Sequence, residues 1–371
     1  MKILVVIGTR PEGIKMAPLV VKMRASKKDT HVCNTGQHGG ILDDVLDFFG
    51  IESDFRLNTL KKGQSLTELT SKIMKGVENI LSQNKYDWIA VHGDTTSCFA
   101  SALAGFYCNV KILHVEAGLR TYSLNNPYPE EANRQLVARI ASKHYCPTTK
   151  AKENLLSEID INSENLIVTG NTVIDALILA VSKINKTPPP FGDLINEKLS
   201  KEDFLILITF HRRENHNKVG ILIDAINDIL RSFNHVKIFL TVHPNPKVKA
   251  PLTTSFSTNN RVTLMEPLRY DEFVWLMQKS DLIMTDSGGV QEEAPSLSKR
   301  VLVLRDITER PEAVEAGTVK LVGCDRMKIL ENVEMAINDK RHYGELKVAK
   351  NPYGDGKSCD RIVNNLLDTH S

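Results

Sequence analysis

The chain lacks the residue patterns of several large classes of protein. Its six cysteines have neither the spacing of metal ligands nor the density of a disulfide framework, which is typical of buried free thiols in a reducing compartment. A formal net charge of +2 argues against non-specific nucleic-acid binding. No apolar run is long enough to span a bilayer, and the N-terminus lacks the charged and apolar regions of a signal peptide. We therefore expect a cytoplasmic protein that binds neither nucleic acid nor membrane.

Apolar segments alternate with segments of helical periodicity, which predicts parallel sheets covered by helices on both faces. The expected strands are Lys2–Ile7, His31–Thr35, Trp88–Val91, Lys111–Val115, His144–Cys146, Phe204–Thr209, Lys237–Val242, Val262–Leu264, Leu282–Met284 and Val301–Leu304. The expected helices include Gly13–Arg24, Leu42–Phe49, Leu66–Leu81, Val173–Ile184 and Ile221–Ser232. The pattern indicates the α/β class with doubly wound sheets, in which ligands bind at the carboxyl ends of the strands.

This alternation is interrupted near the middle of the chain. A length of 371 residues exceeds one ordinary core and fits two domains. After Asn171 a predicted helix leads to three consecutive prolines, 188–190, which suit an exposed connector. We expect a first domain over residues 1–170 and a second over 171–354, facing each other across a cleft. A last helix, 355–371, is expected to pack back on the first domain.

Polar residues follow two of the expected strands in the first domain. Arg10, in Gly8–Glu12, could offer a fork of donors to a phosphate, although a surface arginine beside a proline-started helix is the alternative. Lys15 lies one turn further and either adds charge to such a site or is solvated. Asp94, in H-G-D-T-T-S, is a candidate acid/base group or the N-cap of the next helix.

Two more carboxylates lie nearby in the expected topology. Glu116 closes a strand in H-V-E-A-G-L-R-T, where it is either catalytic or paired with Arg120, because a carboxylate in so apolar a setting is usually paired. Glu130 opens a helix in P-E-E-A-N-R, where an acidic residue also complements the helix dipole. Three carboxylate clusters in one domain favour a shared site.

In the second domain, the run T-D-S-G-G-V-Q-E-E-A-P at 285–295 follows an expected strand and leads into a helix. The amides of Ser287, Gly288 and Gly289 would lie at the helix N-terminus, where an anion such as phosphate is favoured. Glu293 follows one turn later, within reach of ribose hydroxyls. A helix-capping turn with an acidic first turn is the alternative.

Three further residues of the second domain follow strands. His211, flanked by Arg212 and Arg213, can hold an anion, and His243 could contact a nucleotide. Arg310 repeats the Arg-Pro-Glu order and is a candidate ligand or a structural salt bridge. The chain contains no zinc pattern, Walker loop, nucleophile elbow or dinucleotide fingerprint. We therefore expect acid/base chemistry on a bound nucleotide derivative, without a metal.

Nine motifs occur in order between residues 8 and 313: G-T-R-P-E, T-G-Q-H, H-G-D-T-T, H-V-E-A-G-L-R-T, P-E-E-x-N-R, T-G-N-T-V-I-D, H-R-R-E-N, D-S-G-G-V-Q-E-E-A-P and T-E-R-P-E-A. Over essentially its whole length the chain closely resembles the non-hydrolysing UDP-N-acetylglucosamine 2-epimerases. The resemblance implies the glycosyltransferase-B architecture of two Rossmann-like domains with a central cleft. It also implies a homodimer and the interconversion of UDP-N-acetylglucosamine (UDP-GlcNAc) and UDP-N-acetylmannosamine (UDP-ManNAc) without a cofactor.

The resemblance also implies roles for individual residues. UDP departs by elimination across C1–C2 to give a bound 2-acetamidoglucal, then adds again after protonation on the other face. The residues placed at the sugar are Asp94, Glu116, Glu130 and His211, while those placed at UDP are Arg10, Lys15, His243, Phe273, Ser287, Gly288, Gly289, Glu293 and Arg310. Phe273 is placed at the uracil, with a core aromatic as the alternative. Which carboxylate is acid and which is base stays open.

Some bacterial members bind a second UDP-GlcNAc as an activator. This chain keeps Gln37 and His38 of that site, but has Gly40 and Gly63 at two positions where the family pattern has Gln and Arg. We therefore predict little or no requirement for an activator. The alternatives for the function are a hydrolysing epimerase that releases ManNAc and UDP, a UDP-sugar glycosyltransferase, and an inactive nucleotide-sugar sensor; the carboxylate trio favours the epimerase.

Overall fold

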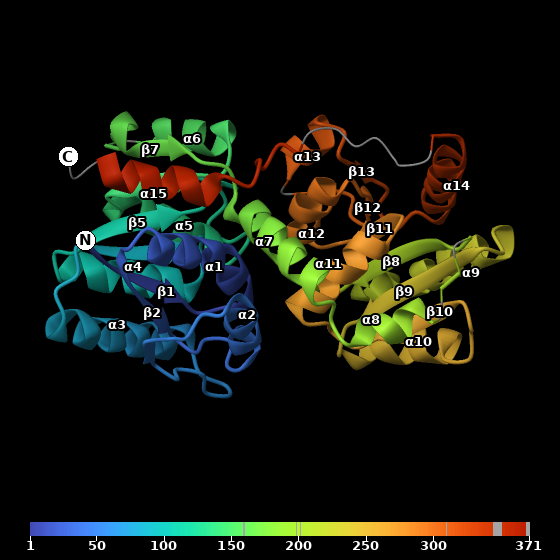
Figure 1. The fold of residues 1–371 in the computed structure, drawn as a ribbon, viewed down its shortest axis with the longest axis horizontal. Helices are drawn as coiled ribbons and strands as arrows, with labels where there is room; N and C mark the ends of the chain where they lie inside the picture. The colour runs from blue at the N-terminus through green and yellow to red at the C-terminus, as the bar shows by residue number, and fades with distance from the viewer. Residues whose placement is uncertain (159, 198, 201, 309, 344–350, 369–371) are drawn as a thin grey trace. The chain divides into compact units, whose positions relative to one another are not determined.

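The structure is a computed structural model that describes residues 1–158, 160–197, 199–200, 202–308, 310–343 and 351–368. The chain forms two compact units, each built around one parallel sheet (Figure 1). Met1–Leu179 and Tyr353–Ser371 make up the first unit, and Ala180–Pro352 make up the second. The prediction of doubly wound α/β architecture with two parallel sheets is confirmed.

The first unit contains a seven-stranded parallel sheet in the order β3-β2-β1-β4-β5-β6-β7. Its strands are β1 (Lys2–Ile7), β2 (Asp29–Asn34), β3 (Phe55–Arg56), β4 (Trp88–His92), β5 (Lys111–Val115), β6 (Lys143–Cys146) and β7 (Leu166–Val168). From β1 the chain runs outward to β3 and then returns to the other side of β1 as β4. The strand order therefore reverses between β1 and β4, where a doubly wound sheet binds its ligands.

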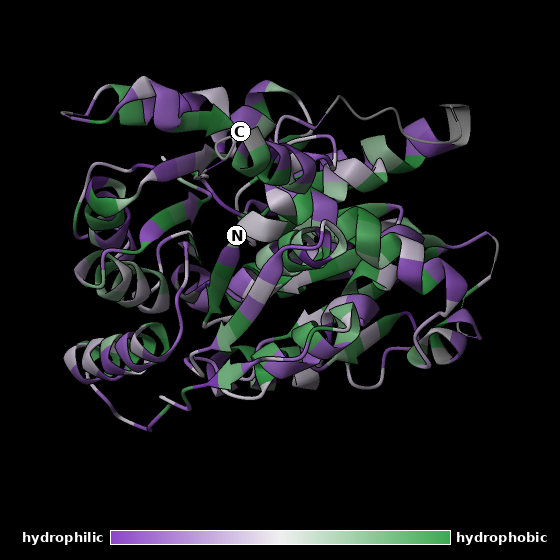
Figure 2. Cartoon of the chain, turned by 60° about the vertical axis from the view of Figure 1, so that its left-hand side comes forward, coloured by the Kyte–Doolittle hydropathy of each residue, from purple (hydrophilic) through white to green (hydrophobic). Residues whose placement is uncertain are grey.

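Helices connect these strands, and a further helix follows the last of them. They are α1 (Arg10–Ala25), α2 (Ile41–Phe49), α3 (Leu66–Gln83), α4 (Thr96–Tyr107), α5 (Glu130–Ile140), α6 (Thr149–Leu156) and α7 (Thr172–Lys186), with a 3₁₀ turn η1 (Ser163–Asn165). Of these, α7 continues into the second unit. In α3 the buried residues Leu69, Ile73, Val77 and Ile80 recur every three or four positions, so one face packs on the core. The helices show alternating hydrophobic and hydrophilic stretches (Figure 2).

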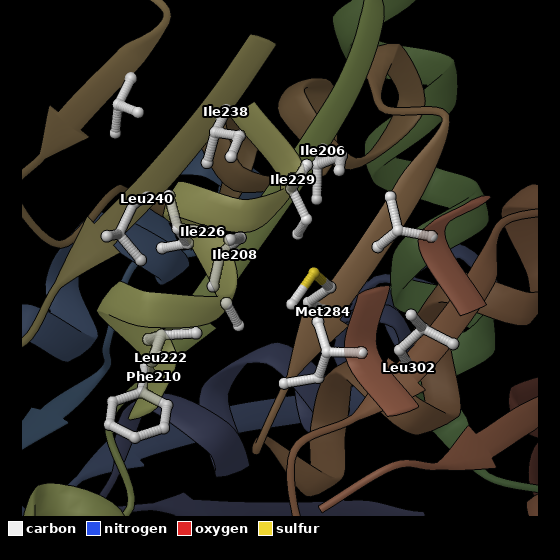
Figure 3. Close-up of a cluster of buried hydrophobic side chains, with 14 of the residues drawn as sticks. Ile206, Ile208, Phe210, Leu222, Ile226, Ile229, Ile238, Leu240, Met284 and Leu302 are labelled. Atoms are coloured by element: carbon white, nitrogen blue, oxygen red, sulfur yellow. The ribbon is translucent and has the colours of Figure 1, made fainter. Parts of the chain in front are cut away.

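The second unit contains a six-stranded parallel sheet in the order β10-β9-β8-β11-β12-β13. Its strands are β8 (Phe204–Phe210), β9 (Val236–Val242), β10 (Val262–Met265), β11 (Leu282–Thr285), β12 (Arg300–Val303) and β13 (Val319–Leu321). Here the order reverses between β8 and β11. Ile206, Ile208, Ile226 and Ile229 belong to a buried cluster that joins β8 to α9 (Figure 3).

The remaining helices are α8 (Phe191–Asn196), α9 (Val219–Ser232), α10 (Pro246–Phe256), α11 (Tyr270–Lys279), α12 (Gly288–Glu293), α13 (Pro311–Glu315), α14 (Arg326–Tyr343) and α15 (Ser358–Asp368), with 3₁₀ turns η2 (Arg213–Lys218) and η3 (Ala294–Leu297). The C-terminal helix α15 contacts α1 and α7 of the first unit: Asp360 pairs with Lys22, and Asp175 accepts hydrogen bonds from the amides of Ser358 and Cys359. Among the described helices, none has the length and apolar character needed to cross a membrane.

Candidate active site

A pocket of about 370 Å3 lies in the first unit, at the carboxyl ends of β1, β2, β4 and β5. The residues that line it are Thr9, Pro11, Glu12, Lys15, Gln37, His38, Leu66, His92, Asp94, Thr95, Thr96, Glu116, Pro129 and Glu130. The structure thus brings together six of the predicted site residues, including all three carboxylates of the first domain. No group of His, Cys, Asp or Glu in the described part of the chain is arranged to hold a metal ion.

Glu116 directly follows β5 and has a φ of 61°, a left-handed conformation that is uncommon for a residue other than glycine. Its side chain is 9% exposed, and Oε1 pairs with the Lys15 ammonium group. Oε2 lies 3.6 Å from Nε2 of His92. The alternative pairing with Arg120 is wrong, because the Arg120 side chain is fully buried and binds Glu158 at 2.6 Å instead.

Asp94 follows β4 and its carboxylate lies 2.5 Å from the Arg134 guanidinium group on α5. The alternative reading of Asp94 as an N-cap is wrong. Thr95 caps α4, since its hydroxyl accepts the hydrogen bond from the amide of Cys98 at 3.0 Å. Asp94 therefore does not cap α4, and it lines the pocket together with Glu130, the first residue of α5.

The expected loop Gly8–Glu12 is mostly helical, because α1 begins at Arg10 and not at Gly13. Thr9 is the N-cap, and Glu12 completes a capping box by accepting the amides of Gly8 and Thr9 at 2.9 and 2.7 Å. The other oxygen of Glu12 accepts the Thr95 hydroxyl at 2.5 Å. Burial raises the pKa of Glu12 to about 7. The sequence analysis missed Glu12, although T-x-x-E is a capping-box pattern.

Gln37 and His38 also line this pocket. The side-chain oxygen of Gln37 accepts the amide and hydroxyl of Ser97 at 3.1 and 2.7 Å, so the side chain points toward the start of α4. The His38 ring accepts the amide of Arg10 at 3.3 Å, and burial lowers its pKa. A Cβ added at Gly40 or at Gly63 would have no atom within 4 Å, so both positions face open space.

The second unit carries its own polar cluster at the end of β8 and β11. Asp286 is fully buried and accepts hydrogen bonds from the amides of His211 and Arg212 at 3.1 and 2.9 Å. Its Oδ1 lies 3.1 Å from Nδ1 of His211, whose side chain is 44% exposed. Desolvation lowers the pKa of His211, and the carboxylate of Asp286 opposes that change. The sequence alone indicated no role for Asp286.

Ser287 precedes α12, which begins at Gly288. The amide of Ser287 was expected to face an anion, but it donates to the Thr285 hydroxyl at 2.9 Å, which leaves the amides of Gly288 and Gly289 at the helix N-terminus. A Cβ at Gly288 would lie 3.7 Å from the Arg212 side chain and 3.9 Å from the Arg310 guanidinium group, so both cations border this turn. Arg310 also forms an ion pair with the buried Glu292. The turn therefore combines backbone amides with two guanidinium groups, an arrangement suited to an anion.

Three other predicted ligands of the second unit have defined surroundings. Glu293 is buried and accepts the Tyr270 hydroxyl at 2.8 Å, which joins α12 to α11. Phe273 lies half-buried on α11. The His243 ring accepts the amide of Asn245 at 3.1 Å and lies 5.1 Å from the His216 ring, measured between centroids. Phe273 is therefore not a fully buried core aromatic, because part of the residue stays accessible to solvent.

Comparisons with known proteins agree with this arrangement. A sequence model of the family described as UDP-N-acetylglucosamine 2-epimerase matches residues 21–367. The chain is 46% identical to the UDP-N-acetylglucosamine 2-epimerase of Campylobacter jejuni, covering 99% of this chain and 97% of the relative. It is 45% identical to the enzyme of the same name from Escherichia coli strain K12, covering 99% and 98%.

Solved structures show the same similarity. The UDP-GlcNAc 2-epimerase of Neisseria meningitidis, bound to UDP-GlcNAc, has a TM-score of 0.88 and 44% identity, covering 99% of this chain and all of that one. The enzyme of Methanocaldococcus jannaschii, in complex with UDP-GlcNAc and UDP, has a TM-score of 0.81 and 34% identity over 99% and 100%. The chain therefore belongs to the UDP-N-acetylglucosamine 2-epimerase family, which confirms the resemblance inferred from the nine ordered motifs.

Proposed function

We propose that this enzyme is an isomerase that interconverts UDP-GlcNAc and UDP-ManNAc without releasing the sugar. The observation that carries the proposal is the pocket of the first unit, where Asp94, Glu116 and Glu130 gather in a chain of this family. Inversion at C2 requires a proton to be removed from one face and delivered to the other, which more than one carboxyl group can supply. A glycosyltransferase has no need of such a set.

The reaction we propose is an elimination followed by the reverse addition. A carboxylate takes the C2 proton, the C1–O bond breaks, and UDP leaves with the bonding electron pair to give 2-acetamidoglucal. UDP then adds back at C1 while a carboxylic acid returns a proton to the opposite face of C2. The C2 proton is a poor acid until positive character develops at C1, so stabilising the leaving diphosphate lowers the barrier to both events.

Groups of the second unit are suited to that stabilisation. The turn at the start of α12 carries the amides of Gly288 and Gly289, and the Arg310 guanidinium group borders it. Asp286 holds the backbone amide of His211 nearby. We assign the diphosphate to this turn and the ribose to Glu293. The uracil ring is assigned to His243 and Phe273. Arg10 and Lys15 of the first unit are assigned to the bound substrate as additional cations.

Proton NMR of the purified enzyme with UDP-GlcNAc in D₂O, without added cofactor, tests this function. We expect UDP-ManNAc that carries deuterium at C2 and still carries its nucleotide. Release of free ManNAc and UDP would instead identify a hydrolysing epimerase. An unchanged spectrum, with UDP binding confirmed by calorimetry, would contradict the proposal.

We further propose that the enzyme needs no activator. Gln37 is engaged by Ser97, and the positions of Gly40 and Gly63 offer no side chain to a second nucleotide sugar. Reaction progress from pure UDP-ManNAc should start without a lag. A long lag that traces of UDP-GlcNAc abolish would overturn this proposal.

The cellular setting is also a proposal. The family suggests a cytoplasmic homodimer that supplies UDP-ManNAc for a polysaccharide. Light scattering coupled to gel filtration should give twice the chain mass of 41.5 kDa. A mass that stays at 41.5 kDa at micromolar concentration would rule out the homodimer.

A further inference from the structure

Asn171 lies directly before α7, in the motif T-G-N-T-V-I-D, and its side chain reaches the pocket carboxylate Glu116. Asn171 is 3% exposed, and its Nδ2 donates a hydrogen bond to Oε1 of Glu116 at 2.9 Å. Its side-chain oxygen accepts the amide of Val173 at 3.0 Å. Because that oxygen is held by an N–H donor, the amide nitrogen is the end that faces Glu116.

The backbone of Asn171 is fixed by a segment almost two hundred residues away. Its amide donates to the carbonyl of Tyr353 at 2.7 Å. The preceding Gly170 has a φ of +88°, and a Cβ there would lie 2.7 Å from the Ser358 hydroxyl. The returning C-terminal segment therefore packs directly against this turn and holds Asn171 in place. Few other side chains at position 171 could therefore be accommodated without moving the Glu116 carboxylate.

Three donors lie close to the Glu116 carboxylate. Lys15 and Asn171 both contact Oε1, and Nε2 of His92 lies 3.6 Å from Oε2. Lys15 comes from α1, His92 from the end of β4, and Asn171 from the start of α7. The acidic groups Glu12, Asp94 and Glu130 line the same pocket, and the buried thiol of Cys98 interacts electrostatically with Glu12, Asp94 and Glu116.

We propose that Asn171 is a positioning residue that fixes the Glu116 carboxylate in its ionised form, ready to accept the C2 proton. The Lys15 ammonium group balances the negative charge of Glu116, whereas the hydrogen bond from the neutral Asn171 side chain orients the carboxylate. A protonated Glu116 would turn an O–H toward one of these donors and lose that hydrogen bond, so the ionised form is favoured. The inference rests on the proposed epimerase function and adds a role for a residue that does not line the pocket itself.

The variants Asn171→Asp and Asn171→Ala test this role, with Asn365→Asp as the matched control. The aspartate variant would be nearly isosteric and would still accept the Val173 amide, but it places a second carboxylate beside Glu116. We expect the acidic limb of the kcat/KM profile to move upward by about one pH unit or more, because a neighbouring like charge disfavours ionisation. Asn365 lies on α15, accepts hydrogen bonds from Lys143 and Tyr145, and is outside the pocket, so its variant should keep the wild-type profile.

For Asn171→Ala we expect kcat to fall by roughly ten- to a hundredfold, with KM changed much less. The acidic limb should move upward by less than in Asn171→Asp, because a donor to the ionised carboxylate is lost but no like charge is added. The rate of C2 proton exchange with D₂O should fall by the same factor. A purely structural role would lower the melting temperature and leave kcat and the pH profile of the folded enzyme unchanged. That outcome, or an unmoved limb in Asn171→Asp, would overturn the proposal.

These results are separable from a failure of the function itself. Wild-type enzyme measured in the same assay establishes whether epimerisation occurs at all. If Asn171→Ala fails to fold, the pH profile of the near-isosteric Asn171→Asp still decides. Binding of UDP, measured by calorimetry, should stay within about twofold of wild type in both variants because the assigned UDP residues belong mainly to the second unit.

Discussion

Replacing Glu12 with glutamine should make the stability of the first unit less dependent on pH. Glu12 is 2% exposed, and its carboxyl group accepts three hydrogen bonds, from the amides of Gly8 and Thr9 and from the Thr95 hydroxyl. Burial penalises the charged form, whereas these hydrogen bonds favour it. Burial is the larger effect, and it raises the pKa of this group from 4.5 to about 7.

The sign and size of the effect follow from this shift. Between pH 4.5 and about 7 the folded chain keeps a proton on Glu12 that the unfolded chain has already lost. The stabilisation due to that proton is fully present below pH 4.5 and disappears as pH rises through the folded pKa. A pKa difference of this size corresponds to about 3 kcal/mol of unfolding free energy as an upper bound.

The assay is urea unfolding from pH 5 to pH 8, followed by fluorescence of Trp88 in a Trp275→Phe background. The chain has two tryptophans, and only Trp88 belongs to the first unit. We expect the free energy of unfolding of Glu12→Gln, measured relative to wild type, to rise by up to about 3 kcal/mol across this range. Glutamine can still accept the amides of the capping box.

Glu68→Gln is the matched control. Glu68 holds the same position in the capping box of α3, where its carboxylate accepts the amide of Ser65 at 3.0 Å, but its side chain is exposed. This variant should show no such trend with pH. A flat difference for Glu12→Gln as well would refute the reasoning, because it would mean that the three hydrogen bonds outweigh burial and keep Glu12 ionised.

Three further substitutions test other parts of the structure. Gly118 has a φ of +89°, and a Cβ there would lie 2.1 Å from the carbonyl oxygen of Ala151, so Gly118→Ala should cost more than about 3 kcal/mol or prevent folding. Gly50→Ala, at a φ of +73° with no atom within 4 Å, should cost only about 1 kcal/mol, and equal losses in urea unfolding would contradict this account. Asp286→Asn should weaken UDP binding about tenfold in calorimetry, because it removes an acceptor from the amides of His211 and Arg212. Binding within about twofold of wild type would show that those amides hold their loop without Asp286.

Most of the strands could be predicted because both faces of a parallel sheet are buried, so each central strand is a run of apolar residues. The strands that escaped prediction lie at sheet edges or are short. β3 is two residues long, and β7 and β13 are three residues long with exposed or half-buried positions. Their residues pair with a neighbouring strand through backbone hydrogen bonds, which leave no pattern of side chains in the sequence.

The residue types of the candidate site could also be predicted, but their pairings could not. Glu116 pairs with Lys15, 101 positions away, and not with Arg120, four positions away. Asp94 pairs with Arg134 of α5 and leaves the capping of α4 to its neighbour Thr95. Such pairings depend on which strands are adjacent in the sheet. The pattern of apolar residues along the sequence predicts where strands lie, but not their order in the sheet.

Once the strand order is known, a common requirement explains the two buried acids that the sequence analysis overlooked. In each unit the order reverses between two strands, β1 and β4 or β8 and β11, and the loops that follow them diverge and leave room for a ligand. Backbone amides in those loops have no neighbouring strand to pair with, so they need another acceptor. Glu12 meets this need by accepting the amide of Gly8 and the hydroxyl of Thr95, and Asp286 meets it by accepting the amide of His211. Neither acid resembles a group that acts on a substrate, because each forms its hydrogen bonds to a loop. Those loops carry the residues that we assign to the substrate.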